Sequence, residues 1–96
     1  MEFHHEQDAH RYTMRNGRDL VGTLDYTINQ NSIALVRSFT TPPYRGHGYA
    51  AELVQFAVDD IDRNTTLSIV PVCWYVSDWF GNHPERSGLL DRAESA

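Results

Sequence analysis

The chain has 96 residues, of which 41% are hydrophobic and 11% aromatic, and this composition favours a single folded domain over a disordered chain. The formal net charge is −5, and all eight basic residues are arginine. This balance argues against a nucleic-acid-binding protein, because such proteins usually carry a basic excess on one face.

The sequence also lacks the usual signals for export or membrane insertion. No apolar run approaches the roughly 18 residues that a membrane span requires, and the N-terminal stretch MEFHHEQDAH has no apolar core of the kind found in secretory signals. We therefore expect a cytoplasmic protein that does not enter the membrane.

Cysteine and histidine are the residue types that could indicate a disulfide or a metal site. Cys73 is the only cysteine, so it cannot form an internal disulfide or build a metal site by itself. His4, His5 and His10 could be read as ligands, but the first two lie in a terminus that we expect to be frayed. We interpret all three as incidental and predict no metal site.

In chain order, the first predicted element is a β-hairpin. His10, Tyr12 and Met14 alternate with polar residues, and the second strand extends over residues 20–28. Between them, Asn16-Gly17 is expected to supply the positive φ angles of a tight turn.

A third strand is predicted over residues 32–41. Strict alternation places Ile33, Leu35, Arg37 and Phe39 on one face, and Ala34, Val36 and Ser38 on the other. Both faces are largely apolar, so this strand is expected in the interior of the sheet. Pro42 and Pro43 end it, because neither can donate a ladder hydrogen bond.

Helical spacing begins at about His47 and ends at Asn64-Thr65. The predicted helix buries a stripe formed by Ala50, Leu53, Val54, Ala57 and Ile61. The stretch TLSIVPV then reads as a short buried strand. Two helical pieces follow, WYVSDWF and HPERSGLL, separated by a break at Gly81 and a restart at Pro84. The tail after Leu90 is expected to be loose.

This order predicts an α/β (α+β) fold built on a mixed, mostly antiparallel sheet of about four strands. A glycine loop and helix cross over to a parallel strand, and helices follow at the C-terminal end. We expect one domain over residues 1–96, with an ordered core of about residues 9–90. In such sheets ligands tend to bind at the C-terminal ends of parallel strands.

The glycine loop lies at that place. Arg45 supplies charge, Gly46 and Gly48 allow close approach to the main chain, and the helix N-terminus that follows carries unpaired N–H groups. Together these features suit a phosphate. The loop matches neither the P-loop nor the complete dinucleotide-binding fingerprint. A simple turn between strand and helix remains open at this point.

The stretch YRGHGYA resembles the R-x-x-G-x-A acyl-CoA pyrophosphate signature of the GNAT superfamily of N-acetyltransferases. Four stretches together resemble the short, single-domain GNAT-like family, in the same order and at similar spacing: HRYTMRNGRDLVGTLDY, PPYRGHGYAAELV, VPVCWYV and WFGNHPE. The resemblance covers nearly the whole chain, from about Ala9 to Leu90.

This resemblance implies a fold and a ligand. It implies acetyl-CoA or CoA, with the pantetheine arm lying along the strand before the loop and hydrogen-bonded to its main chain. The implied pantetheine contacts are the backbones of Phe39, Thr40 and Thr41. The implied pyrophosphate contacts are Arg45, Gly46, His47, Gly48, Tyr49 and Ala50. Members of this family often have a His-Thr pair where this chain has Ser38-Phe39, so any role of that histidine is not carried over.

The resemblance also makes Cys73 the candidate catalytic residue. It could act as a nucleophile through an acyl-enzyme, protonate the departing CoA thiolate, or be only a small buried residue. A thiol with an ordinary pKa of about 8.5 is mostly protonated at pH 7, so a nucleophilic role needs activation. We expect His47 to lie beside a phosphate rather than to act as the general base. We interpret the aromatic residues Trp74, Tyr75, Trp79 and Phe80 as core or as a wall for CoA.

Three hypotheses follow. The first is an acetyl-CoA-dependent N-acetyltransferase acting on an unidentified amine, either a small molecule or a protein lysine. The second is a CoA-binding module with little or no catalysis. The third is a protein-interaction domain in which the glycine loop is only a turn. The sequence does not identify the acceptor or the oligomeric state.

Overall fold

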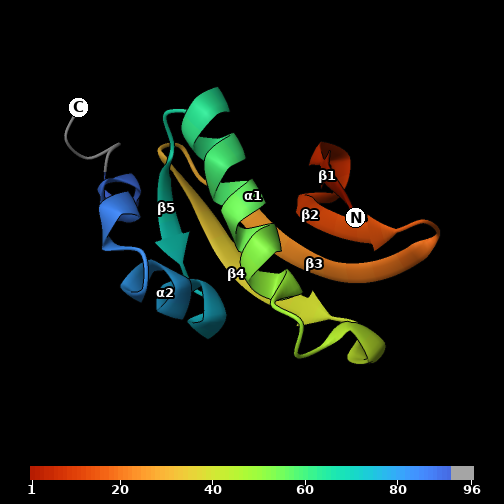
Figure 1. Cartoon of the computed structure of the whole chain (residues 1–96). Helices are drawn as coiled ribbons and strands as arrows, with labels where there is room; N and C mark the ends of the chain where they lie inside the picture. The colour runs from red at the N-terminus through yellow and green to blue at the C-terminus, as the bar shows by residue number, and fades with distance from the viewer. Residues whose placement is uncertain (92–96) are drawn as a thin grey trace.

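The computed structural model describes residues 1–91, which form one sheet with a long helix packed across it and shorter helical segments beside it (Figure 1). The strands are β1 (Glu2–Glu6), β2 (Arg11–Asn16), β3 (Asp19–Ile28), β4 (Ser32–Thr40) and β5 (Ser68–Pro71). The α-helices are α1 (Tyr49–Asn64) and α2 (Trp74–Gly81), and the 3-10 helices are η1 (Gln7–Ala9), η2 (Pro42–Tyr44) and η3 (Pro84–Leu90). The mixed fold class predicted from the sequence is confirmed.

The sheet has the strand order β1-β2-β3-β4-β5. Neighbouring strands are antiparallel except β4 and β5, which are parallel. The chain passes from β4 to β5 through the glycine loop and α1, which is the predicted crossover. The sheet is mostly antiparallel as expected, but it has five strands instead of about four.

The additional strand is β1, which the sequence analysis treated as a frayed terminus. It pairs with β2 along its whole length, with Phe3 opposite Met14 and His5 opposite Tyr12. The ring of Phe3 also stacks on Phe56 of α1 at 5.0 Å. The expectation of fraying was therefore wrong. Phe56 lies far from Phe3 in the sequence, whereas β2 follows β1 after only four residues. The stretch EFHHE has one apolar residue and no apolar alternation, so its own pattern does not indicate a strand. The predicted loose tail falls largely outside the described residues.

The β2–β3 hairpin is confirmed, but its turn is shifted by one residue from the prediction. Asn16 pairs with Asp19, so the two turn residues are Gly17 and Arg18. Gly17 has a φ of 61°, the left-handed region that glycine adopts at little cost, whereas Asn16 belongs to the strand.

The interior position of β4 is confirmed, but the prediction of strict alternation along it was wrong. Asp25 pairs with Arg37 and Tyr26 pairs with Leu35, so Val36 is an extra residue on β4, a β-bulge. Beyond the bulge the two faces exchange. Ser38 lies opposite the buried Leu24 and shares the face of Leu35, whereas Arg37 and Phe39 turn to the other face and are exposed.

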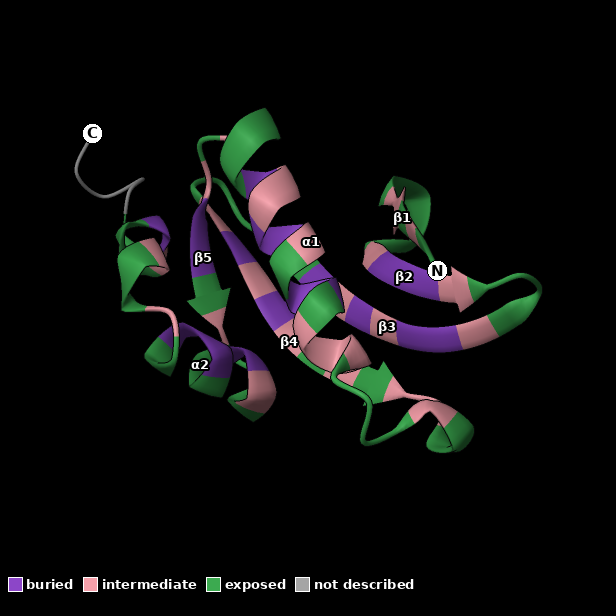
Figure 2. Ribbon diagram, viewed as in Figure 1, coloured by how far each residue is buried: buried purple, intermediate pink, exposed green. Residues whose placement is uncertain are grey.

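The core lies between α1 and the sheet, where purple segments of the helix and strands face one another in Figure 2. The predicted apolar stripe of α1 is confirmed, with Val58 added and Ala50 only half-buried. Burying one large aliphatic side chain contributes about 1.5–3 kcal/mol. The fully buried side chains on either side of this interface include Leu24, Leu35, Val54, Val58, Ile61 and Ile69.

The helix boundaries follow from local chemistry. α1 begins one residue after Gly48, which is its N-cap. It ends where the Thr65 N–H donates to the Ile61 carbonyl at 3.1 Å, as the sequence predicts. The two C-terminal helical pieces are also confirmed as α2 and η3. Among residues 1–91, no helix combines the length and the apolar character needed to cross a membrane.

Candidate functional site

The loop before α1 is held open by its glycines. Gly46 and Gly48 have φ angles of 82° and 80°, a backbone region that other residues adopt only with strain. A Cβ atom built on either glycine would meet no atom within 4 Å. Backbone conformation therefore requires glycine here, and the space beside the loop is free for a ligand.

The N-terminus of α1 faces this loop. Its N-cap, Gly48, provides no side-chain cap for the first-turn N–H groups. A 16-residue helix has a partial positive charge at this end. The loop and helix together therefore offer main-chain donors and positive potential to an anion.

Arg45 lies across the end of β4. Its Nε donates to the Thr40 carbonyl at 2.9 Å, and its guanidinium carbon is 5.8 Å from the centre of the Phe39 ring. Arg45 remains exposed in this position. His47 is also exposed, with its ring centre 5.5 Å from that of Tyr49. The charge of Arg45 thus lies where β4 enters the glycine loop.

β4 and β5 stop pairing before β4 reaches this loop. Their pairing runs from Ser32 opposite Ser68 to Leu35 opposite Pro71, and the Cys73 N–H then donates to the Leu35 carbonyl at 2.9 Å. After this bond the chain enters α2, whereas β4 continues to Thr40, past the end of β5 (Figure 1). Within residues 1–91, this stretch of β4 has an edge that β5 does not cover.

The predicted pantetheine contacts lie at the far end of this edge. The Thr40 carbonyl already accepts the bond from Arg45. The Thr41 N–H donates to the Val21 carbonyl at 2.8 Å, and the Thr41 carbonyl accepts from the Tyr44 N–H at 2.8 Å. The main chain of Thr41 is thus already engaged within the protein.

Cys73 lies at the near end, at the N-cap of α2. Burial by itself would raise the pKa of its thiol. Hydrogen bonds to the sulfur from the Val76 and Tyr75 N–H groups, and from the hydroxyl and main-chain N–H of Ser38, outweigh burial and lower the pKa. The thiol is half-buried, so it retains contact with solvent.

The two ends of the uncovered edge are well separated. Leu35, which binds Cys73, and Thr40, which binds Arg45, pair with Tyr26 and Gly22 of β3, and these are four positions apart, or roughly 13 Å at the rise of a β-strand. An elongated ligand with an anionic end and a reactive end matches this arrangement. His47 belongs to the anionic end, away from the thiol.

The aromatic residues of α2 divide into two groups. Trp79 and Phe80 are buried in the core, as the sequence suggested. Trp74, which directly follows Cys73, has 77% of its surface exposed, so it is not a core residue, and its alternative role as a wall for CoA stays a prediction. Val72, on the other side of Cys73, is 59% exposed.

Ser38 is the site residue that sequence reasoning missed. Strict alternation placed it on the face of Ala34 and Val36, whereas the bulge at Val36 turns it to the face of Leu35. Its residue type carries no signal of a function. The bulge could have been found only from the register of β4 against β3.

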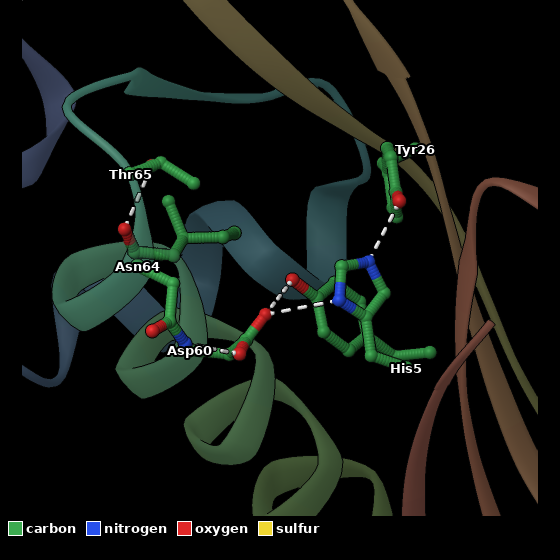
Figure 3. Close-up of polar contacts among 7 residues, drawn as sticks. His5, Tyr26, Asp60, Asn64 and Thr65 are labelled. Carbon is green, nitrogen blue, oxygen red and sulfur yellow. Dashed lines mark hydrogen bonds and ion pairs between the residues drawn. The ribbon is translucent and has the colours of Figure 1, made fainter. Parts of the chain in front are cut away.

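A second polar cluster surrounds His5, one of the histidines interpreted as incidental (Figure 3). His5 Nδ1 lies 3.1 Å from Asp60 Oδ2, and its Nε2 lies 2.7 Å from the Tyr26 hydroxyl. Tyr12 and Asn64 also donate to Asp60, at 2.8 and 2.7 Å. The His5 ring stacks on Tyr12 at 4.2 Å.

The ionisation of this cluster is fixed by its surroundings. Burial raises the pKa of Tyr12 strongly, and its bond to Asp60 raises it further, so Tyr12 is a neutral donor. Burial and the charge of Asp60 also raise the pKa of Tyr26. The cluster links β1 and β3 to the C-terminal half of α1. Among residues 1–91, no group of three or more histidine, cysteine or acidic side chains is arranged to hold a metal ion.

The comparisons with known proteins agree with the fold. Residues 11–89 match a family model described as GCN5-related N-acetyl-transferase. A search of curated proteins found no match. Enzymes of this family are acetyltransferases that generally use acetyl-CoA. The chain therefore belongs to the GCN5-related N-acetyltransferase family.

Proposed function

We propose that the protein is an acetyl-CoA-dependent N-acetyltransferase that acts through Cys73. The observation that carries this proposal is the placement of a thiol of lowered pKa at one end of an uncovered strand edge, with an anion-binding loop at the other. Family membership supports the general reaction. The donor, the site residues and the acceptor are the parts that need testing.

The residues of the site fit the donor by their chemistry. Arg45 and the main chain from Gly46 to Ala50 would hold the pyrophosphate, with His47 and Tyr49 beside it. Among the predicted pantetheine contacts, the main chain of Thr40 points to the uncovered edge and would align the arm as an added strand. The main chains of Phe39 and Thr41 face β3 and would join it only by exchanging partners. Acetyl-CoA supplies a thioester whose acetyl carbon is open to attack.

Cys73 would carry the acetyl group in two balanced steps. Its thiolate attacks the acetyl carbon, a new sulfur–carbon bond forms, and the CoA sulfur–carbon bond breaks, so that the CoA thiolate leaves and takes a proton from solvent. A neutral amine then attacks the acetyl-Cys73 thioester. The amide bond forms, the Cys73 thiolate is regenerated, and the amine nitrogen loses its proton to solvent.

The acceptor would be an exposed amine, on a small molecule or on a protein lysine. Cys73 lies between Val72 and Trp74, whose side chains are 59% and 77% exposed. An acceptor can therefore approach the sulfur from solvent without entering an enclosed pocket.

Two measurements test the function. CoA should raise the melting temperature, because a ligand that binds only the native state stabilises it. Release of free CoA thiol from acetyl-CoA should then depend on the amine added from a panel. No melting shift at millimolar CoA would reject the donor site, and binding without amine-dependent thiol release would favour the CoA-binding module instead.

A further inference from the structure

The β-bulge at Val36 determines which side chain of β4 faces Cys73. Leu35 pairs with Tyr26 and Ser38 pairs with Leu24, so both lie on the face that packs against the helices. Without the extra residue, Ser38 would share the opposite face with Ala34. Bulges are frequent beside active sites, where they change the direction of a side chain.

The main chain of Ser38 is turned toward the same place. The Thr41 N–H points to β3, where it donates to Val21. Because main-chain groups alternate in direction along a strand, the N–H of Ser38 points to the uncovered edge. The Cys73 N–H bond to Leu35 brings the cysteine against this edge. Ser38 therefore lies on the face and at the edge against which Cys73 is held, and hydrogen bonding from Ser38 is among the causes that lower the pKa of the Cys73 thiol.

We propose that Ser38 is a positioning residue for Cys73, because the bulge turns its hydroxyl to the face, and its main-chain N–H to the edge, against which Cys73 is held. Its catalytic meaning rests on the proposed function. The N–H groups of Tyr75 and Val76 approach the same sulfur from α2. Polar groups of both β4 and α2 therefore contribute to the lowered pKa of the thiol.

This arrangement stabilises the thiolate twice in the proposed cycle. Ser38 donates to the sulfur before it attacks the acetyl carbon, and again when the acetyl–sulfur bond breaks. A thioester sulfur is a weaker acceptor than a thiolate, so the two bonds favour the charged form. Ser38 itself makes no contact with the reacting carbon in this scheme.

Other ionisable groups on α2 and β4 do not account for the titration of Cys73. They are Tyr75 and Asp78 on α2, and Arg37 on β4. Burial and the nearby Asp78 raise the pKa of Tyr75, which keeps it neutral. The bulge turns Arg37 to the opposite face of the sheet.

The test is the pH dependence of Cys73 alkylation by iodoacetamide, which needs neither acetyl-CoA nor an acceptor. Cys73 is the only thiol in the chain, so the rate reports on one site. The variants are Ser38→Ala, the isosteric pair Ser38→Thr and Ser38→Val, and the control Ser87→Ala, which removes an exposed hydroxyl from η3.

Ser38→Ala and Ser38→Val should raise the midpoint of the alkylation profile by about one pH unit, the effect of one lost hydrogen bond to a charged group. The rate at neutral pH should fall because less of the thiol is ionised. The fall should be only roughly threefold, since a more basic thiolate is intrinsically more reactive. Ser38→Thr and Ser87→Ala should keep the wild-type midpoint.

An unchanged midpoint in folded Ser38→Ala or Ser38→Val would overturn the proposal. If Ser38→Ala does not fold, the Thr and Val variants still differ by one hydroxyl in the same volume. A shifted midpoint in a protein that shows no acetyl transfer would uphold the role of Ser38 and reject the proposed function. The two failures are thus distinguishable.

Discussion

The two polar regions of the protein lie toward opposite ends of α1 and differ in how their groups are satisfied. At the C-terminal half of the helix, Asp60 accepts from Tyr12 and Asn64 and contacts His5, which in turn bonds Tyr26. At the N-terminal end, the loop has two glycines of positive φ beside open space.

The difference separates a structural cluster from the proposed binding site. The groups around Asp60 are engaged in hydrogen bonds and ring stacking with one another. These contacts therefore contribute to the stability of the fold. The loop, the uncovered edge of β4 and the Cys73 sulfur combine donors with space. A ligand can complete these groups without displacing the core. Variants at the two ends should therefore divide into those that alter function and those that alter stability.

The largest expected effect is that of Cys73→Ser at the functional end. Amine-dependent thiol release should fall at least about a hundredfold, since the hydroxyl is a much poorer nucleophile than the thiolate. The melting temperature and its rise with CoA should stay close to wild type. A variant that retains full turnover would remove Cys73 from the mechanism.

Asp60→Ala should produce the reverse pattern. It leaves the Tyr12 hydroxyl buried without its acceptor, so the free energy of unfolding should fall by about 2 kcal/mol. Chemical denaturation checks this value, with the exposed Asp8→Ala as control. The CoA-induced melting shift should persist. Loss of that shift in folded protein would mean that the two ends are coupled.

Arg45→Ala should weaken CoA binding roughly tenfold, the effect of about 1.4 kcal/mol of lost phosphate contact. The control is Arg63→Ala, which removes another exposed arginine from the last turn of α1. Calorimetric titration with CoA measures both. Equal affinities for the two variants would contradict the assignment of the loop.

The smallest effect concerns Glu6, which ties β1 to β2 beside the structural cluster. Hydrogen bonds from Thr13 and then Arg11 lower the pKa of its carboxyl below the ordinary value of 4.5. A carboxyl whose pKa is lower in the folded state than in the unfolded state stabilises the fold at any pH above the unfolded-state pKa. This stabilisation is lost as the pH falls through the folded-state pKa. Melting temperatures between pH 5 and 3 should show this decline, and Glu6→Gln should flatten it. An equal decline in the variant would exclude Glu6 as its source.

Sequence patterns predicted the parts of the fold that are encoded locally. The apolar residues of β2, β3 and α1 repeat at the period of their element, which is why these elements could be predicted. Gly81 and Pro84 mark the break before η3. β1 was missed because the stretch EFHHE has no apolar alternation, and because Phe56 and Asp60, which it contacts on α1, are distant in the sequence. The bulge at Val36 was missed because no residue of β4 announces it.

The candidate site follows the same division. The glycine loop could be located because Gly46 and Gly48 are needed by a local backbone conformation. The position of Cys73 near the sheet edge could also be anticipated from the strand before it. The contact of Ser38 with the sulfur could not, since it depends on the bulge and on the meeting of β4 with α2. Residue patterns do not show how elements that are distant in the sequence pack against each other.

Cys73 has one more consequence, which concerns how acetylation can be traced. The chain has this single thiol and no lysine, so it offers no side-chain amine on which an acetyl group could accumulate as an amide. An acetyl group on Cys73 would be removed by hydroxylamine, whereas an amide at the chain terminus would resist it. Intact mass before and after that treatment would identify the carrier atom. Any acetyl-lysine found in a mixture with another protein would belong to that protein alone.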